Sequence, residues 1–257
     1  ITKNKKTEEK MFNRINRKII HVILIIVVIF VILFVSGIFI LRYQVEGESN
    51  MPFTITKISI IQTVEGIENN DTENKWNFNV NENNDIYIYL EKNSNYNKTE
   101  IIESVTINNI SIKKENEIGT SKIYKPVTDE KRMFINTTEN ETTEITYTGA
   151  LESNIKQQEI SNQGGKIAFR YAIDNISQYI SQNAEEINHS QLLKLTNVQK
   201  EDIQSEISFE LTIKLKSGKI YRTDISVEIP GEDVIEEGTK GIEITDLQNI
   251  IFKRLEN

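Results

Sequence analysis

The chain has 257 residues, of which 38% are hydrophobic and 26% charged, and its formal net charge at pH 7 is −8. Eight of the 30 basic residues but only two of the 38 acidic residues lie in positions 1–42, so the rest of the chain carries a net charge of −14. This acidic balance argues against nucleic acid as a partner. The absence of cysteine excludes disulfide bonds and metal sites built on cysteine.

Residues 19–41 form one apolar stretch without a fixed charge, IIHVILIIVVIFVILFVSGIFIL. As a helix rising about 1.5 Å per residue it spans roughly 34 Å, enough to cross a hydrocarbon core of about 30 Å. A cleaved signal peptide is the alternative, but its apolar core has about 7–15 residues and precedes a small-residue cleavage site, which is absent here. The sequence therefore predicts a single transmembrane helix over residues 19–41, of the signal-anchor type.

The charges that flank this stretch predict its orientation. Residues 1–18 contain seven lysines and arginines, whereas Arg42 is the one basic residue directly after the stretch. The positive-inside rule places the short basic tail 1–18 in the cytoplasm and the chain from about residue 43 outside, after a linker at 42–51. Met11 is an alternative start, and a further alternative is that a cytoplasmic domain precedes Ile1. An external region without cysteine and rich in Ile, Asn, Lys and Glu favours a bacterial protein of the cell membrane.

From residue 52 onward the apolar residues recur with the period of two that is typical of strands with one buried face. The phase of this pattern shifts by one residue between 53–55 and 58–60, and it shifts again at Asn108-Asn109. A one-residue slip would expose the buried side chains, so a β-bulge is predicted near Lys57 and another at Asn108-Asn109.

The middle of the chain contains further predicted strands. Residues 76–80 and 86–90 both alternate, and the polar run 82–85 between them predicts the turn of a β-hairpin. A clear strand at 167–173 follows the polar stretch 151–165, which ends in two glycines, and a short helix is predicted over 190–195. Weaker strands are predicted at 121–127, 131–136 and 143–149.

The strongest local pattern lies between Ile207 and Ile229. A two-residue turn would mix the apolar and polar faces of the two strands, whereas a three-residue loop at 216–218 pairs Ile213 with Tyr221 and Phe209 with Ile225. The longer loop also puts Gly218 at the left-handed position that such loops need. The sequence thus predicts this hairpin in a defined register.

The chain ends with the capping-box pattern Thr245-Asp246-Leu247-Gln248, which predicts a C-terminal helix. The predicted fold is mainly β, an antiparallel β-sandwich with a C-terminal helix, formed by residues 52–257 outside the membrane. The alternative is a subdivision near 150–165 into two immunoglobulin-sized domains, split at Gly164-Gly165.

No residue pattern indicates an enzyme, a cofactor or a metal. His189-Ser190 matches no catalytic signature, the acidic clusters lack calcium-loop spacing, and no particular carboxylate pair is indicated. Possible surface-binding residues are Tyr87, Tyr89 and Tyr96, whose rings could stack on sugars or contact a protein.

The predicted function is a non-enzymatic, membrane-anchored binding or scaffolding module outside the cell. Its partners are the lipid bilayer, through residues 19–41, and an envelope protein or a wall glycan. A glycan-binding module that uses the three tyrosines is the alternative, and a carboxylate-based hydrolase of wall polymers is a less favoured one.

Overall fold

The computed structural model of the protein describes residue 22 and residues 24–36, 51–69, 76–96, 98–181 and 188–255. The chain forms two compact units, Ile1–Glu46 and Gly47–Asn257. In the first unit residues 24–36 are helical, and their apolar side chains are between 45% and 72% exposed. No helix of the described residues is long and apolar enough to cross a membrane. The other residues of the predicted span 19–41 lie outside the described residues, so the transmembrane helix stays a prediction.

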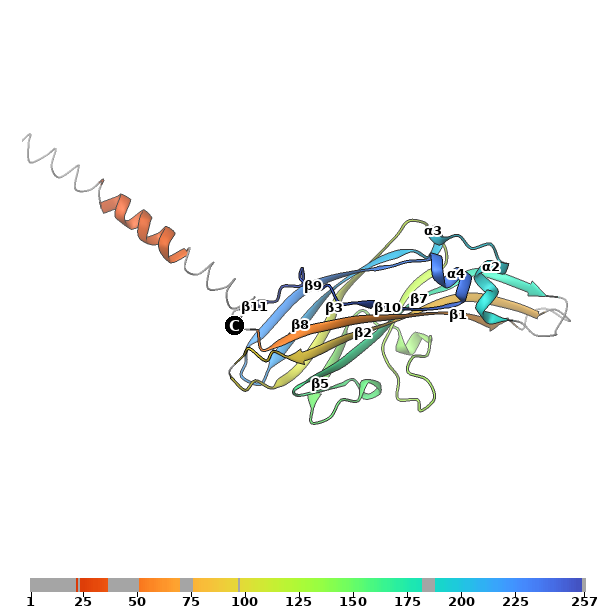
Figure 1. Ribbon diagram of the computed structural model, residues 1–257, viewed down its shortest axis with the longest axis horizontal. Helices are drawn as coiled ribbons and strands as arrows, with labels where there is room; N and C mark the ends of the chain where they lie inside the picture. The colour runs from red at the N-terminus through yellow and green to blue at the C-terminus, as the bar shows by residue number, and fades with distance from the viewer. Residues whose placement is uncertain are drawn as a thin grey trace, which may run out of the picture. The chain divides into compact units, whose positions relative to one another are not determined.

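The second unit is built from two sheets that pack face to face, which confirms the predicted mainly β fold (Figure 1). One sheet has five strands in the order β10-β1-β2-β7-β4, and the other has six in the order β11-β9-β8-β3-β5-β6. The strands of the five-stranded sheet are β1 (Phe53–Glu68), β2 (Trp76–Lys92), β4 (Thr120–Tyr124), β7 (Gly164–Ser181) and β10 (Thr239–Ile244). Those of the six-stranded sheet are β3 (Ile102–Lys114), β5 (Ile145–Ala150), β6 (Glu159–Ser161), β8 (Ser205–Leu215), β9 (Ile220–Ile229) and β11 (Lys253–Leu255).

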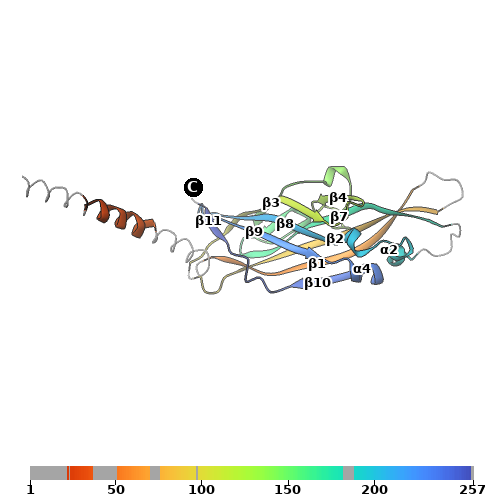
Figure 2. The same ribbon diagram turned by 90° about the horizontal axis from the view of Figure 1, so that it is seen from above.

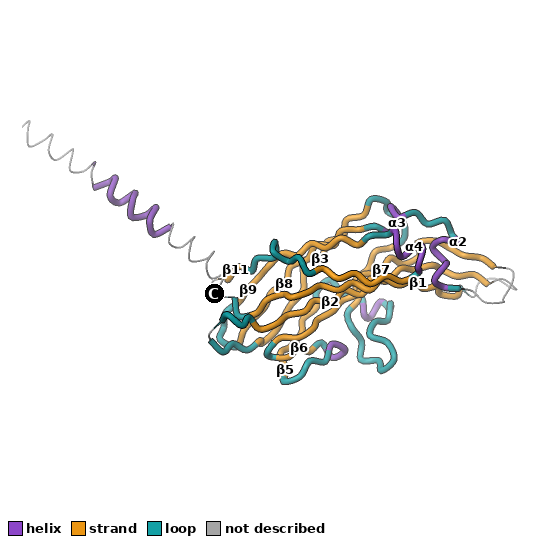
Figure 3. The backbone as a smooth tube through the Cα atoms, viewed as in Figure 1, coloured by secondary structure: helices purple, strands orange, loops and turns teal. Residues whose placement is uncertain are grey.

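The strand axes of the two sheets are nearly aligned with one another, as the two views of the sandwich agree in showing (Figures 1 and 2). Short helices gather at one end of it (Figure 3). The helices of the unit are η1 (Thr138–Asn140), η2 (Ile155–Gln157), η3 (His189–Gln191), α2 (Leu192–Leu195), α3 (Lys200–Ile203) and α4 (Glu232–Glu237). The helix predicted over 190–195 is therefore present as η3 and α2.

The inner faces of the two sheets share one hydrophobic core. At its centre the rings of Phe169 on β7 and Phe209 on β8 meet edge to face, with 5.3 Å between their centroids. Where β4 stops short, the hydroxyl of Tyr147 on β5 donates a hydrogen bond to the Ala168 carbonyl of β7 and accepts one from the Ala168 N–H. This side chain thus provides the pairing that a neighbouring strand would give to that edge.

The predicted hairpin is confirmed in its register. Ile213 pairs with Tyr221 and Phe209 with Ile225, and the loop of residues 216–218 has Gly218 at φ 83°. Phe209 is 2% exposed, so the apolar face of the hairpin lies in the core as predicted.

Both predicted bulges are confirmed. The pairing of β1 with β2 shifts between Ile55 and Lys57, and the pairing of β3 with β8 shifts between Asn108 and Ser111. Asn109 has the positive φ of 52° that a bulge residue commonly adopts. Each bulge restores the apolar face of its strand to the core.

The predicted hairpin at 76–90 is wrong. Residues 76–92 form one continuous strand, β2, and the run 82–85 that reads as a turn lies in its middle. The strand lies between β1 and β7, which pair with it on both sides through this run. Because these neighbours satisfy its backbone groups, the polar side chains do not interrupt the strand.

Two further predictions are wrong. Residues 245–252 form a loop rather than a helix, and they are followed by the short strand β11, which pairs with β9. Phe252, at 4% exposed, packs into the core directly before β11. Residues 131–136 also form no strand, because they fold over the five-stranded sheet, where Phe134 is buried.

Strands on either side of Gly164-Gly165 pair with each other in both sheets. In the five-stranded sheet β7 pairs with β2 and β4, and in the six-stranded sheet β8 pairs with β3. The two glycines themselves open β7, opposite Leu90 and Glu91 of β2.

Candidate functional site

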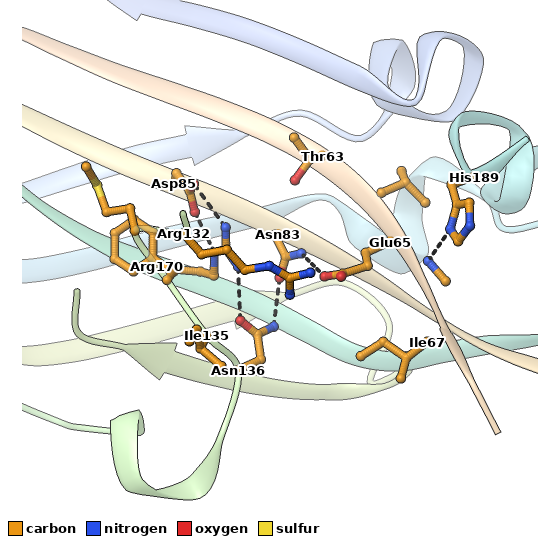
Figure 4. Close-up of a pocket in the computed structure, with 14 residues that line it drawn as sticks. Thr63, Glu65, Ile67, Asn83, Asp85, Arg132, Ile135, Asn136, Arg170 and His189 are labelled. Atoms are coloured by element: carbon orange, nitrogen blue, oxygen red, sulfur yellow. Dashed lines mark hydrogen bonds and ion pairs between the residues drawn. The ribbon is translucent and has the colours of Figure 1, made fainter. Parts of the chain in front are cut away.

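A pocket of about 590 Å³ opens on the outer face of the five-stranded sheet, beneath the segment that connects β4 to β5 (Figure 4). We call it the outer-face groove. Its polar and apolar lining comes from β1 (Thr63, Glu65, Ile67), β2 (Asn83, Asp85), β7 (Arg170), the connecting segment (Arg132, Phe134, Asn136) and η3 (His189). Its volume falls in the range of small-molecule and peptide sites.

In the middle of β2, at residues 82–85, the strand carries polar side chains on both faces. Asn83 and Asp85 line the groove on the outside, whereas Glu82 and Asn84 point into the sandwich between the core residues Val80 and Ile86. The polar run that resembles a turn in the sequence thus supplies an outer binding surface and an inner polar cluster.

An ion pair forms the floor of the groove. Asp85 and Arg170 are direct cross-strand neighbours, and their side chains meet in a two-pronged contact. Arg170 Nε donates to Asp85 Oδ1 at 2.6 Å and Nη2 donates to Oδ2 at 3.1 Å. The side chains are only 13% and 15% exposed, and the Arg170 guanidinium lies 5.0 Å from the centre of the Phe134 ring. This geometry fixes both charges in place.

Asn136 connects this ion pair to the rest of the groove. Its Oδ1 accepts from Arg170 Nη1 at 3.1 Å, and its Nδ2 donates to Asn83 Oδ1 at 2.8 Å. Asp174 is a second acceptor at 3.4 Å, and it also accepts a hydrogen bond from the Tyr124 hydroxyl at 2.8 Å. The segment above the groove is therefore held to the sheet by a continuous polar network.

The rim of the groove carries less restrained polar groups. Glu65 accepts one long hydrogen bond from Asn83 Nδ2, at 3.4 Å. His189 Nδ1 accepts a hydrogen bond from the Gly66 N–H at 3.1 Å. The guanidinium of Arg132 forms no ion pair within the described part of the chain. Arg132 and Glu65 are both among the residues that line the groove (Figure 4).

Behind the sheet, the inner polar cluster consists of Gln62, Glu82 and Asn84. Gln62 Nε2 lies within hydrogen-bonding distance of Glu82 Oε1 (3.0 Å), Asn84 Oδ1 (3.1 Å) and the Pro230 carbonyl (2.9 Å). Glu82 is fully buried, and burial raises the pKa of its carboxyl from 4.5 to about 8 despite these hydrogen bonds. Among the described residues its Oε2 has no hydrogen-bond partner. Glu82 is thus a neutral acid in the core at neutral pH.

The structure separates the three tyrosines that the sequence singles out. Tyr87 and Tyr89 share the outer face of β2, but each is only half-exposed and has a lysine over its ring. Lys166 Nζ lies 5.0 Å from the ring centre of Tyr87, and Lys57 Nζ lies 4.7 Å from that of Tyr89. The Tyr87 hydroxyl contacts Met133, and burial raises the pKa of Tyr87 to about 12.

Tyr96 belongs to a different cluster, near the β8–β9 loop. Lys219 Nζ donates to the Tyr96 hydroxyl at 3.1 Å and to Glu100 Oε1 at 2.7 Å. Burial tends to raise the pKa of Glu100, but the hydrogen bonds from Lys219 and Ser217 hold it below its usual value. The three tyrosines therefore do not form one continuous strip.

The other sequence candidates have structural partners. Ser190 Oγ donates to Asn188 at 2.7 Å, and His189 binds Gly66, so the two side chains do not form a nucleophile–base pair. No group of three metal-ligating side chains occurs among the described residues. The acidic cluster at 68–71 lies partly outside them.

A second pocket of about 660 Å³ lies between β10 and the ends of β3, β8 and β9. Of its charged side chains, Lys113 and Glu206 form an ion pair at 4.0 Å, and they are 84% and 44% exposed. Because these side chains are more exposed and less connected than those of the outer-face groove, the groove is the stronger candidate site.

Comparisons with protein-family models, curated proteins and solved structures found no match.

Proposed function

We propose that the protein is a single-pass, membrane-anchored binding or scaffolding module whose folded domain lies outside the cell and binds its partner in the outer-face groove. The cytoplasmic N-terminus and a location in a bacterial cell membrane belong to this proposal. An envelope protein is the partner that we favour.

The sequence supports the membrane anchor. Residues 19–41 are long and apolar enough to span a bilayer, and the seven basic residues before them favour an N-terminus inside the cell. The acidic domain that follows has no feature that suits nucleic acid.

The observation that carries the binding proposal is the fixed polar floor of the groove. Asp85 and Arg170 neutralise each other in a two-pronged contact, and Asn136 holds the arginine from above. Acid–base catalysis needs a group that can take up and release a proton at the reacting atoms. A charge pair that is locked in this way instead suits the recognition of shape and polarity.

Two observations favour this proposal over a glycan-binding module and over a carboxylate hydrolase. Stacking on sugars needs an open ring face, whereas lysines lie over the rings of Tyr87 and Tyr89. A carboxylate hydrolase needs its raised-pKa acid in a cleft, whereas Glu82 is buried in the core.

Crosslinking and pull-down of the tagged full-length protein from its native membrane test the proposal. Thr63→Trp fills the groove, and Ile61→Trp is the matched control, because Ile61 is an exposed residue on the same face of β1 but outside the groove lining. We expect a consistent protein partner with the wild type, with Ile61→Trp and with the double variant Tyr87→Ala/Tyr89→Ala, and its loss with Thr63→Trp.

Three results would contradict the proposal. Recovery of the partner with Thr63→Trp would show that binding takes place elsewhere. Loss of binding with the tyrosine double variant would indicate that the partner binds at the surface of Tyr87 and Tyr89. Hydrolysis of purified wall material by the full-length protein would show that it is an enzyme.

A further inference from the structure

We infer that the outer-face groove binds a zwitterionic peptide segment of the partner, one that presents both an ammonium and a carboxylate. This inference rests on the proposed binding function and specifies the chemistry of the ligand. It follows from the charges of the groove, from the way in which each charge is held, and from the other residues that line it.

The charges of the groove do not all compensate one another inside the protein. Asp85 and Arg170 form the ion pair of the floor. His189 accepts a hydrogen bond from the Gly66 N–H through Nδ1. Glu65 and Arg132 remain, one negative and one positive, and no ion pair joins them within the described residues. The groove thus offers one charge of each sign outside its ion pair, and Arg132 also interacts electrostatically with Asp129.

The backbones of Arg132 and Glu65 are held in place, while their charged groups form no ion pair with described residues. Arg132 is anchored by its backbone N–H, which donates to Asp129 Oδ1 at 2.9 Å, and the Lys131 N–H donates to the same oxygen at 2.7 Å. These two hydrogen bonds hold the pKa of Asp129 below its usual value and fix the start of the segment above the groove. Glu65 lies on β1, where a single hydrogen bond from Asn83, at 3.4 Å, restrains its carboxylate.

The other residues that line the groove fit a peptide better than a sugar. Ile67 is 44% exposed at the groove and gives an apolar contact for a side chain. Phe134 is 3% exposed and lies under the guanidinium of Arg170, so its ring face is not free for stacking. A neutral sugar would leave the charges of Glu65 and Arg132 unpaired, whereas an ammonium and a carboxylate pair with both.

Isothermal titration calorimetry on the full-length chain in lipid nanodiscs tests this inference. The probes are L-alanyl-L-alanine, its C-terminal amide, which lacks the carboxylate, and its N-acetyl derivative, which lacks the ammonium. We expect the dipeptide to bind the wild type about tenfold or more tightly than either derivative, because each derivative loses one charge-assisted hydrogen bond.

The variants assign each charge to its residue. With Arg132→Ala the dipeptide and its amide should bind equally, while the preference over the N-acetyl derivative remains. With Glu65→Gln the opposite should hold. Lys131→Ala and Glu68→Gln are the matched controls, since both are exposed neighbours outside the groove lining, and they should bind as the wild type does.

The outcomes separate this inference from the proposed function. If the three probes bind alike, or if none binds although partner recovery is still lost with Thr63→Trp, the ligand class is wrong and the groove remains a binding site. If no probe binds and partner recovery is unaffected by Thr63→Trp, the proposed function is wrong as well.

Discussion

Glu82 is an acid whose protonation departs far from that of an exposed glutamate. Its side chain points into the sandwich, where Gln62 is its hydrogen-bond donor and one carboxyl oxygen has no partner among the described residues. Burial raises the pKa of this group from 4.5 to about 8. Because the unfolded chain releases the proton at the lower pH, this residue makes the free energy of unfolding depend on pH.

We therefore expect the contribution of Glu82 to stability to be fully present below about pH 4.5 and to be lost as the pH rises toward about 8. In this window the folded protein holds the proton and the unfolded chain does not. Glu82→Gln keeps a neutral side chain at every pH, so its stability relative to the wild type should increase across the window by up to roughly 1.4 kcal/mol per pH unit. Urea unfolding at pH 4.5, 6 and 8 measures this difference, with the exposed Glu228→Gln as control. A difference that does not vary with pH would contradict the burial of an acid here.

Asp85 and Arg170 provide a second prediction for single residues. Asp85→Asn leaves the Arg170 charge without its carboxylate in a site where the two side chains are only 13% and 15% exposed. Fully buried pairs lose about 3–5 kcal/mol in this way, and for this partly solvated pair we expect about 1–3 kcal/mol. Glu243→Gln removes the exposed Lys57–Glu243 pair of the same sheet and should change the stability little. Equal effects of the two substitutions in thermal unfolding would show that the groove floor is not the structural ion pair described above.

At the level of elements, the β8–β9 hairpin shows how far a local pattern can specify structure. Its alternation and its single glycine determine both the paired residues and the buried face, and the structure agrees with both. The bulges in β1 and β3 are predictable for the same reason. Where the alternation of apolar residues changes phase, an extra residue in a bulge keeps the apolar side chains on the buried face.

The hairpin gives a prediction about stability. Phe209→Ala removes a ring that is 2% exposed and packs against Phe169, so we expect a loss of about 3–5 kcal/mol in the free energy of unfolding. Glu210→Ala on the opposite face of the same strand removes only a partly exposed ion pair with Arg222, and its loss should stay below about 1 kcal/mol. Denaturant unfolding of both variants measures this, and the reverse order would overturn the face assignment.

The elements that the sequence does not predict depend on contacts with distant parts of the chain. The run 82–85 looks like a turn because its side chains are polar, and only the pairing of β2 with β1 and β7 makes it the middle of a strand. The C-terminal capping box is likewise overruled by the pairing of β11 with β9 and by the burial of Phe252.

The outer-face groove could not be found from the sequence for a similar reason. Asp85 and Arg170 are 85 positions apart, and Asn136 reaches them from a segment without regular structure. Two features of the sequence point to the groove: the polar run 82–85 inside an otherwise alternating stretch, and an arginine between the apolar residues of the strand 167–173. Tyr87 and Tyr89 lie on the same face of β2, but their covered rings do not by themselves form a site.

For the whole molecule, charge and hydropathy divide the chain into parts of different composition. A basic tail and an apolar stretch come first. The region that follows carries a net charge of −14 and folds into a sandwich that contains the outer-face groove. A membrane-tethered binding module needs such a division, with one part that anchors and another that recognises. The proposed function therefore requires that the groove lie outside the membrane.

Labelling of single introduced cysteines in intact bacterial cells tests this central claim most directly, because the natural chain has no cysteine of its own. Lys131→Cys, next to the groove, should react with a membrane-impermeant maleimide in intact cells, and the labelled protein should sediment with the membranes. Lys3→Cys, in the basic tail, should react only after the cells are permeabilised. Protection of Lys131→Cys in intact cells, or recovery of the labelled protein in the soluble fraction, would contradict a membrane-anchored module with its groove outside.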